Sequence, residues 1–325
     1  MATVSQASAT SSTSSIEGPR TPNLLDLLTA AASDPSRRPT LVGIAASLTL
    51  FAWMFRDSFS HFLYAWSRDE NYSHGFLVPF ISLYFANLSA QKGPVPIRGG
   101  IGLGMGCLLT ALLIRMITVP LPIPFLADLA LLLGLAGMAA VLFGSGALKR
   151  YWFAFFFLIF MIPLPVALYS RAASPLQLLA SQVASAVMNA TGVPVLREGN
   201  KLTLPGNVEM FVAEACSGMR QLTGFMALTA AVAFLTARPL WYRVLLILSA
   251  FPIALTANIA RVVLTGYIMH FVNPRYASGA FHTLEGLLMM GFGLMLLNLE
   301  CWGLDRLRLM LESSVAEAAD GPATR

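Results

Sequence analysis

Charged residues are scarce in this sequence. Only 21 Lys or Arg and 16 Asp or Glu occur among 325 residues, which is 11%, against roughly 25% in ordinary soluble domains. Apolar residues make up 56%. So few charges cannot cover so much apolar surface in water, so the composition excludes the soluble classes and, away from the chain ends, intrinsic disorder.

Cysteine is scarce too, and a basic cluster is missing. The three cysteines are an odd number far apart, which excludes a disulfide framework. The net charge of +5 is distributed between apolar blocks. That distribution indicates orientation in a lipid bilayer and argues against a nucleic-acid partner.

Long apolar runs are abundant, and a membrane-spanning helix needs about 20 apolar residues. We expect an all-α polytopic membrane protein with about eight transmembrane helices in a membrane domain over 40–301. We expect a disordered cytoplasmic extension over the Ser/Thr-rich residues 1–39 and a short cytoplasmic tail over 302–325. The predicted spans are 40–55, 73–89, 99–118, 125–144, 151–169, 216–235, 240–268 and 281–301.

Lys and Arg in the predicted loops give the orientation. With both termini in the cytoplasm, the inner loops carry twice as many Lys and Arg as the outer loops. The loop 170–215 then lies outside. It combines an amphipathic pattern with a strand–turn–strand pattern around Gly199 and Asn200, which predicts a small extracytoplasmic cap of one helix and one β-hairpin. The amphipathic pattern is formed by Leu176, Leu179, Val183 and Val187.

Three groups of polar residues interrupt apolar spans, where ionisable side chains cost several kcal/mol. They are residues 214–220 (EACSGMR), 258–261 (NIAR) and 282–286 (HTLEG). In the predicted topology Cys216 and His282 lie at the outer ends of the sixth and eighth spans. Arg261 lies about two turns inside the outer end of the seventh. All three groups are therefore expected to converge at the outer face of the membrane.

The residue types in these groups suit nucleophilic catalysis. Cys216 precedes a helix and has Arg220 at i+4, which favours a thiolate. His282 has the reference pKa of a general acid or base. Arg261 is suited to stabilising the oxyanion of a tetrahedral intermediate.

Further polar residues are expected to support this trio. Asn258, at i−3, is placed to hold the guanidinium of Arg261, and Glu285, at i+3, to fix the tautomer of His282. Glu214 and Ser217 flank the cysteine.

The remaining polar and small residues have structural interpretations. We expect Cys107 and Cys301 to be inert apolar residues and Arg115 to pair with an acidic residue or backbone carbonyls. The glycines at 100, 102, 104 and 106 indicate helix packing.

Nothing in the sequence predicts a metal or a cofactor. His282 and Glu285 have the spacing of two ligands, but there is no HExxH motif, and the histidines at 61, 74 and 270 supply no third ligand. The glycine-rich run lies inside a span and is not a phosphate-binding loop.

The three groups together resemble the exosortase/archaeosortase family of membrane-embedded cysteine processing enzymes. Residues 71–79 (NYSHGFLVP) resemble the N-terminal signature of its bacterial branch. The resemblance covers about residues 40–300.

This resemblance implies an enzyme of the bacterial inner membrane whose site faces the periplasm. Its substrates would be exported proteins with a C-terminal sorting signal of the PEP-CTERM type: a short Pro-containing motif, one transmembrane helix and a basic tail. Cys216 would form a thioester with the substrate, His282 would transfer protons, Arg261 would stabilise charge and Arg220 would be a supporting cation. The resemblance also implies an association with exopolysaccharide biosynthesis machinery.

Two other functions remain open from the residues alone. One is a transporter of an anionic or lipid-linked substrate, with Arg115, Arg220 and Arg261 as an anion path. The other is a membrane acyltransferase that uses Cys216.

Overall fold

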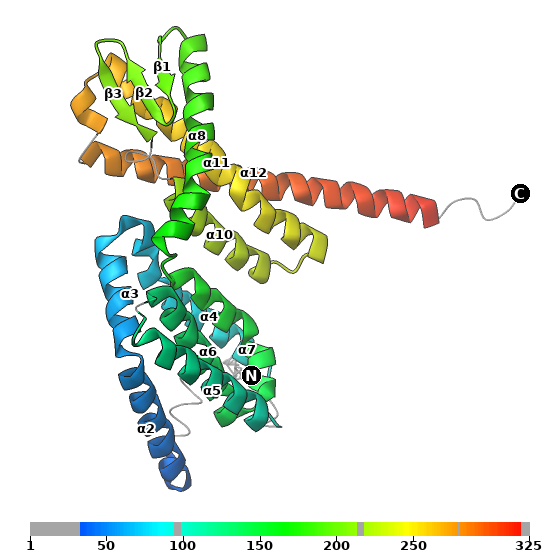
Figure 1. The fold of residues 1–325 in the computed structure, drawn as a ribbon. Coiled ribbons are helices and arrows are strands. Elements are labelled where there is room, and N and C mark those ends of the chain that lie inside the picture. Colours follow the sequence, from blue (N-terminus) through cyan, green and yellow to red (C-terminus); the bar gives the residue numbers. More distant parts are fainter. Residues whose placement is uncertain (1–32, 94–98, 122, 213–217, 278–279, 320–325) are drawn as a thin grey trace, which may run out of the picture.

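The chain folds into helices and one small antiparallel sheet (Figure 1). The computed structural model describes residues 33–93, 99–121, 123–212, 218–277 and 280–319. Helices α2 to α7 lie together in the lower part of Figure 1, and α8, the sheet, α10, α11 and α12 lie in the upper part. The all-α prediction is confirmed, with the three-stranded sheet as its exception.

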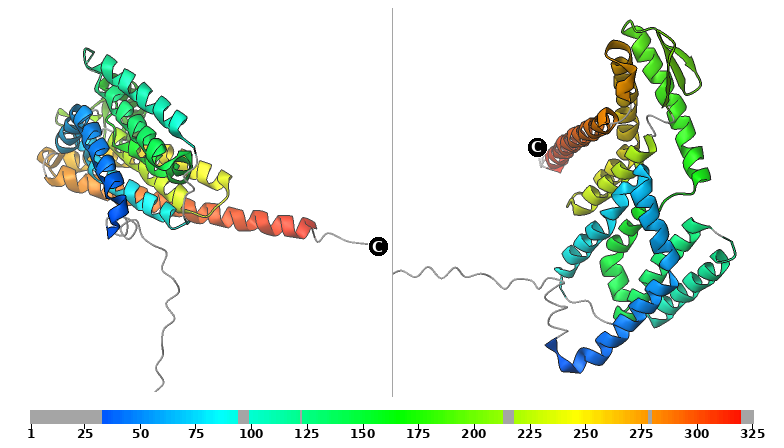
Figure 2. Two further views of the ribbon diagram at one scale, coloured as in Figure 1. Left: turned by 90° about the horizontal axis from the view of Figure 1, so that it is seen from below. Right: turned by 90° about the vertical axis from the view of Figure 1, so that its left-hand side faces the viewer.

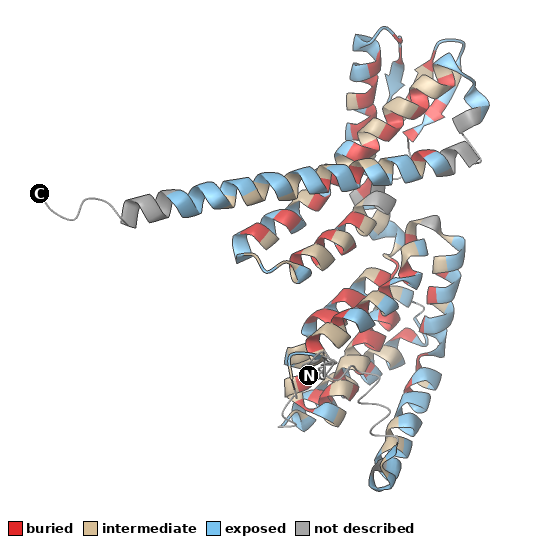
Figure 3. Cartoon of the chain, turned by 180° about the vertical axis from the view of Figure 1, so that it is seen from behind, coloured by how far each residue is buried: buried red, intermediate tan, exposed pale blue. Residues whose placement is uncertain are grey.

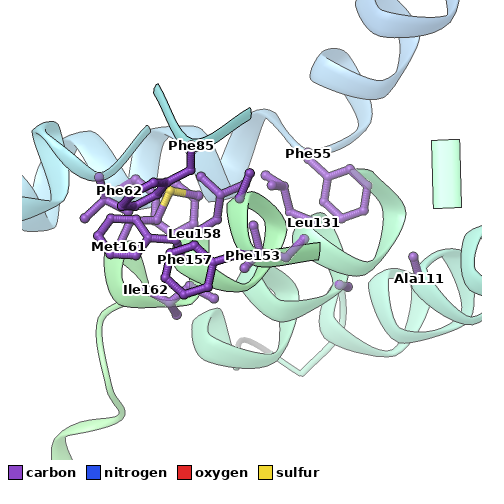
Figure 4. Close-up of a cluster of buried hydrophobic side chains, with 14 of the residues drawn as sticks. Phe55, Phe62, Phe85, Ala111, Leu131, Phe153, Phe157, Leu158, Met161 and Ile162 are labelled. Atoms are coloured by element: carbon purple, nitrogen blue, oxygen red, sulfur yellow. The ribbon is translucent and has the colours of Figure 1, made fainter. Parts of the chain in front are cut away.

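The first group of helices has a core of aromatic side chains. Its elements are η1 (Pro35–Arg37), α2 (Arg38–Met54), α3 (Arg56–Arg68), η2 (Glu70–Phe76), α4 (Val78–Ala90), α5 (Ile101–Thr118), α6 (Pro124–Phe143), α7 (Ser145–Phe157) and η3 (Leu158–Met161). Phe85 of α4 lies edge-on to Phe153 and Phe157 of α7, with ring centroids 4.9 and 5.1 Å apart (Figure 4). Edge-to-face pairs of this kind stabilise a core beyond their buried area.

Glycines bring α5 and α6 into close contact. A Cβ atom at Gly104 would lie 2.8 Å from the carbonyl oxygen of Gly137, and one at Gly100 would lie 2.4 Å from the backbone nitrogen of Ser145. The packing role predicted for Gly100 and Gly104 is therefore confirmed. It is wrong for the glycines at 102 and 106, around which the space is open, because a two-residue step turns a side chain to the far side of a helix.

The second group carries the predicted site. Its elements are α8 (Val166–Ala190), β1 (Leu196–Glu198), β2 (Lys201–Leu204), β3 (Val208–Phe211), α10 (Gly218–Leu235), α11 (Leu240–Phe271), η4 (Pro274–Ala277) and α12 (Ala280–Ala319). Helix α12 projects away from the rest of the chain in both views of Figure 2, and much of its length is exposed in Figure 3. The projecting part includes residues of the predicted C-terminal tail, which are helical as far as Ala319.

The cap contains the predicted helix and hairpin and one further strand. β1 and β2 pair around the turn at Gly199 and Asn200, as predicted. The correction is β3, which pairs antiparallel with β2 and makes a three-stranded sheet. The turn before β3 has positive φ angles at Gly206 and Asn207, 83° and 56°. This Gly–Asn pair is the same turn signal as Gly199–Asn200, but it was not used in the sequence-based prediction of the cap.

The eight predicted spans are not reproduced. Within the described residues, four helices are long and apolar enough to cross a membrane: α5, α6, α11 and the part of α12 from Leu284 to Ser313. Two bent pairs raise the number to six if each is one span. α2 and α3 meet at 65°, and the segment Ser145–Met161 meets α8 at 86°.

Two of the predicted spans are short or broken in the structure. The span predicted over 73–89 contains a helix of only 13 residues, α4. The span over 151–169 is broken after Met161, because Pro163 and Pro165 lack amide hydrogens and disfavour helical conformation in the residues before them. The span predicted over 216–235 contains α10, which has 18 residues from Gly218, and the start of that span lies outside the described residues.

Candidate active site

Three neighbouring helices contain, or directly follow, the polar groups predicted to form the site. α11 packs against both α10 and α12, and the aromatic ring of Phe225 in α10 lies where a Cβ atom at Gly293 of α12 would be, 2.0 Å away. Leu222, near the start of α10, lines the same hollow as Asn258 of α11. The start of α10 therefore lies at the level of Asn258 along α11.

A row of polar side chains lies buried on one face of α11. Asn258, Arg261 and Thr265 follow each other at helical spacing and are 1%, 3% and 0% exposed. Glu285 of α12 is 2% exposed. The hydroxyl of Thr265 donates to Oε2 of Glu285 at 3.0 Å, so the start of α12 meets the same face of α11. Burial of ionisable groups inside apolar helices is costly and marks either a site or a satisfied pair.

The structure therefore brings together three of the predicted residues: Asn258, Arg261 and Glu285. The other five predicted site residues lie wholly or partly outside the described residues. They are Glu214, Cys216 and Ser217, and the side chains of Arg220, in the first turn of α10, and His282, in the first turn of α12. The meeting of the sulfur, the imidazole and the guanidinium stays a prediction.

The cap packs on α11 beside Arg261. Val262, the next residue, belongs to a buried cluster with Met210 of β3 and Met188 of α8. A Cβ atom at Gly266 would lie 2.6 Å from the methyl carbon of Met188, so α8 and α11 cross in close contact. Because β3 ends at Phe211, the sheet leads directly into the segment that contains Cys216.

A small hollow opens between α8, α10 and α11, next to the polar row. Its lining residues are Leu176, Leu222, Phe251, Ala254, Leu255 and Asn258. Oδ1 of Asn258 is buried and accepts no hydrogen bond from any described residue. An unpaired buried carbonyl oxygen costs about 1–3 kcal/mol. Asn258 is therefore a polar residue beside apolar walls, and its carbonyl oxygen has unused hydrogen-bonding capacity.

Sequence reasoning did not assign a role to residues 71–79, and the structure gives one. The two prolines at the break between α7 and α8 leave backbone groups without helical partners. Nε1 of Trp66 donates to the carbonyl of Met161 at 3.0 Å, and Nε2 of His74 lies 3.2 Å from the carbonyl oxygen of Phe160. The amide of Leu164 donates to the hydroxyl of Tyr72 at 3.0 Å. We call these three bonds the break clamp.

The break clamp depends on a glycine. A Cβ atom at Gly75 would lie 2.2 Å from Nε1 of Trp66, the atom that bonds Met161. Burial lowers the pKa of His74, although its hydrogen bond with the carbonyl of Phe160 acts in the opposite direction. His74 is therefore held as a neutral hydrogen-bonding group in η2, which lies outside the candidate spans.

Arg115 has a structural partner, as predicted. Its guanidinium bonds the carboxylate of Asp57, and its Nε donates to the carbonyl of Met54 at 3.2 Å, at the bend between α2 and α3. Among the described residues, Cys107 and Cys301 are free thiols, and no three His, Cys, Asp or Glu side chains are grouped as metal ligands.

Comparison with known protein families identifies the family of this chain. The family described as Transmembrane exosortase (Exosortase_EpsH) matches residues 66–299, which is most of the chain. No curated protein and no solved structure matches this chain. The matched range contains the break clamp, the cap and all three groups of polar residues. This multi-pass membrane protein belongs to the transmembrane exosortase family, whose members are cysteine transpeptidases that sort proteins.

Proposed function

We propose that this exosortase cleaves C-terminal sorting signals of the PEP-CTERM type from exported proteins at the outer face of a bacterial inner membrane, with Cys216 as the nucleophile. The observation that carries the proposal is the buried polar row on α11. Arg261 is 3% exposed there and lies beneath the cap. Its helix, α11, packs against α10, which follows Cys216, and against α12, whose first turn contains His282.

The reaction divides into two steps. In the first, Sγ of Cys216 attacks the scissile carbonyl carbon, the peptide C–N bond breaks, and the amine of the C-terminal fragment leaves with a proton from His282. In the second, water or an acceptor amine attacks the thioester and gives a proton back to His282 as the sulfur leaves. The guanidinium of Arg261 stabilises the negative oxygen in both steps.

The remaining predicted residues have positioning roles in this proposal. Arg220 is a second cation that favours the thiolate of Cys216. Glu214 and Ser217 flank Cys216 in the sequence. Glu285 of α12 is held next to the polar row of α11 by the hydrogen bond that it accepts from the hydroxyl of Thr265. Asn258 lines the hollow, and its Oδ1 accepts no bond from a described residue. We therefore assign its side chain to contact with the substrate rather than to the guanidinium of Arg261.

A client with a single transmembrane helix fits this arrangement. It reaches the site from the lipid and places its juxtamembrane motif under the cap, with both termini of the exosortase in the cytoplasm. The association with exopolysaccharide machinery belongs to the same proposal and rests on the family's resemblance alone.

The decisive experiment replaces the nucleophile. Cys216→Ala should leave the protein in the membrane while uncleaved precursor of a tagged client accumulates. Cys107→Ala and Cys301→Ala, which remove the thiols of two described helices, are matched controls and should process normally. Blotting the client in a strain lacking the native enzyme measures this, and mass spectrometry of the new client C-terminus separates hydrolysis from transfer.

Two outcomes contradict the proposal. Normal maturation of the client by Cys216→Ala removes the nucleophile assignment. A fatty acyl chain, rather than a peptide, trapped as a thioester on Cys216 would instead make the protein an acyltransferase.

A further inference from the structure

A second hollow lies far from the polar row, at the opposite ends of the helices. Its volume is about 410 Å³, within the range of small-molecule sites. It is lined from the end of α4, the start of α7 and the end of α10 by Ser89, Lys92, Gly146, Lys149, Arg150, Trp152 and Phe234. The predicted catalytic chemistry makes no use of this hollow.

The described residues that line the hollow are basic, aromatic or neutral, and none of them carries a carboxylate. Lys92, Lys149 and Arg150 make no ion pair with any carboxylate in the described part of the chain. Nη1 of Arg150 donates to the carbonyl of Ser89 at 3.3 Å, and the ammonium of Lys92 lies 5.9 Å from the ring centroid of Phe234. Three like charges that share one hollow repel each other, so an anion placed between them would be stabilised.

The aromatic residues indicate the kind of anion. Trp152 is 55% exposed at the mouth of the hollow, and Trp is enriched where membrane helices reach the headgroup level. Phe234 forms part of an apolar wall beside the cations. A hollow with cations and an exposed aromatic wall matches a phosphate joined to a glycerol and acyl chains better than it matches a free ion.

We propose that this hollow binds the phosphate of an anionic phospholipid headgroup on the cytoplasmic side of the membrane. The positive-inside pattern explains why Lys and Arg occur at these helix ends, but it does not require them to share a concave site with aromatic walls. The basic tail of a client is excluded from this site because its charge has the same sign.

The test is native mass spectrometry of the full chain in detergent, titrated with phosphatidylglycerol or with phosphatidylcholine. One cation near anionic lipid contributes about fivefold in affinity. Lys149→Gln should therefore weaken the tightest phosphatidylglycerol site about fivefold, and Lys92→Gln with Lys149→Gln about 25-fold. The matched control is Arg306→Gln. Arg306 is exposed, and its guanidinium lies over the ring of Trp302, as the ammonium of Lys92 lies over that of Phe234. This control should change the affinity less than twofold.

Three results would overturn the proposal. One is an equal loss of phosphatidylglycerol binding in Lys149→Gln and Arg306→Gln, since that indicates a nonspecific surface charge effect. The second is equal affinity for phosphatidylcholine. The third is protection against thermal unfolding by inorganic phosphate that phosphatidylglycerol does not increase, because the site would then take the free ion. None of these measurements uses client cleavage, so failure here leaves the proposed catalytic function untouched.

Discussion

At the scale of single residues, Thr265 links two of the helices that form the site. Its side chain is fully buried, and its hydroxyl reaches both Oε2 of Glu285 on α12 and the carbonyl of Arg261 on its own helix. Glu285 in turn lies one helical turn after His282. The position of the start of α12, and with it the expected general acid, therefore depends on a neutral hydroxyl.

We expect Thr265→Val to destabilise the protein and to lower client cleavage. Valine has nearly the same shape but no hydroxyl, so the buried carboxyl of Glu285 loses a hydrogen bond at a cost of about 1–3 kcal/mol. Thermal unfolding in detergent measures the first effect and client processing the second. Thr265→Ser keeps the hydroxyl and should retain most of both. If Val and Ser variants behave alike, the hydrogen bond does not position α12.

At the scale of elements, the break between α7 and α8 decides where the cap can lie. The two prolines end the helix, and the chain turns by 86° into α8, whose far end packs against the sheet and α11. Buried backbone groups freed at such a break must find partners inside the protein. The break clamp supplies them from Trp66, Tyr72 and His74.

Removing one bond of the break clamp should weaken the fold. Tyr72→Phe leaves the amide of Leu164 without its acceptor, which should cost about 1–3 kcal/mol and lower the midpoint of thermal unfolding. Tyr84→Phe is the control, because Tyr84 is exposed on the neighbouring α4. Equal midpoints for the two variants would contradict the clamp.

The break clamp should also be sensitive to acid. Burial lowers the pKa of His74 in the folded protein, so folding favours the neutral ring. Stability from this group is complete above the unfolded pKa of about 6.5. It falls as the pH drops below that value toward the lowered folded pKa. In the unsubstituted protein, the midpoint of thermal unfolding should decline as the pH is lowered from about 7.5 to about 5.

The matched variant for this measurement is His74→Gln. Glutamine keeps an N–H donor for the carbonyl of Phe160 and does not titrate. Its unfolding midpoint should decline less over the same pH range. An identical decline in both proteins assigns the acid sensitivity to other groups.

At the scale of the whole molecule, the cap and the basic hollow should lie on opposite sides of the membrane. The hollow joins the ends of α4 and α10 with the start of α7. The cap packs on the later half of α11, near the beginnings of α10 and α12. This placement agrees with the distribution of Lys and Arg along the chain.

Labelling with a membrane-impermeant thiol reagent tests the orientation. Glu198→Cys, on exposed β1, should react in intact spheroplasts. Lys149→Cys, at the hollow, should react only after the membrane is permeabilised. The unsubstituted chain gives the background from its native cysteines. The reverse pattern would place the cap in the cytoplasm and contradict cleavage at the outer face.

Features that depend on local chemistry could be predicted from the amino-acid sequence. The apolar composition predicted membrane helices, and the Gly199–Asn200 pair predicted the hairpin. The order of the motifs indicated the exosortase family. It also implied that Arg115 needs a partner, because a charge in an apolar helix is not left unpaired.

The division of the apolar runs into helices, and the contacts that these helices make, depend on tertiary packing. Hydropathy counts apolar residues, but it does not show that a run such as 151–169 bends at its prolines, since the partners of the freed backbone groups come from residues about 90 positions earlier. Contacts between residues 20 or more positions apart also place Asn258 at a hollow, join Thr265 to Glu285 and bring three cations from two helix ends into the basic hollow. These features follow from packing between distant segments, and local sequence patterns do not predict them.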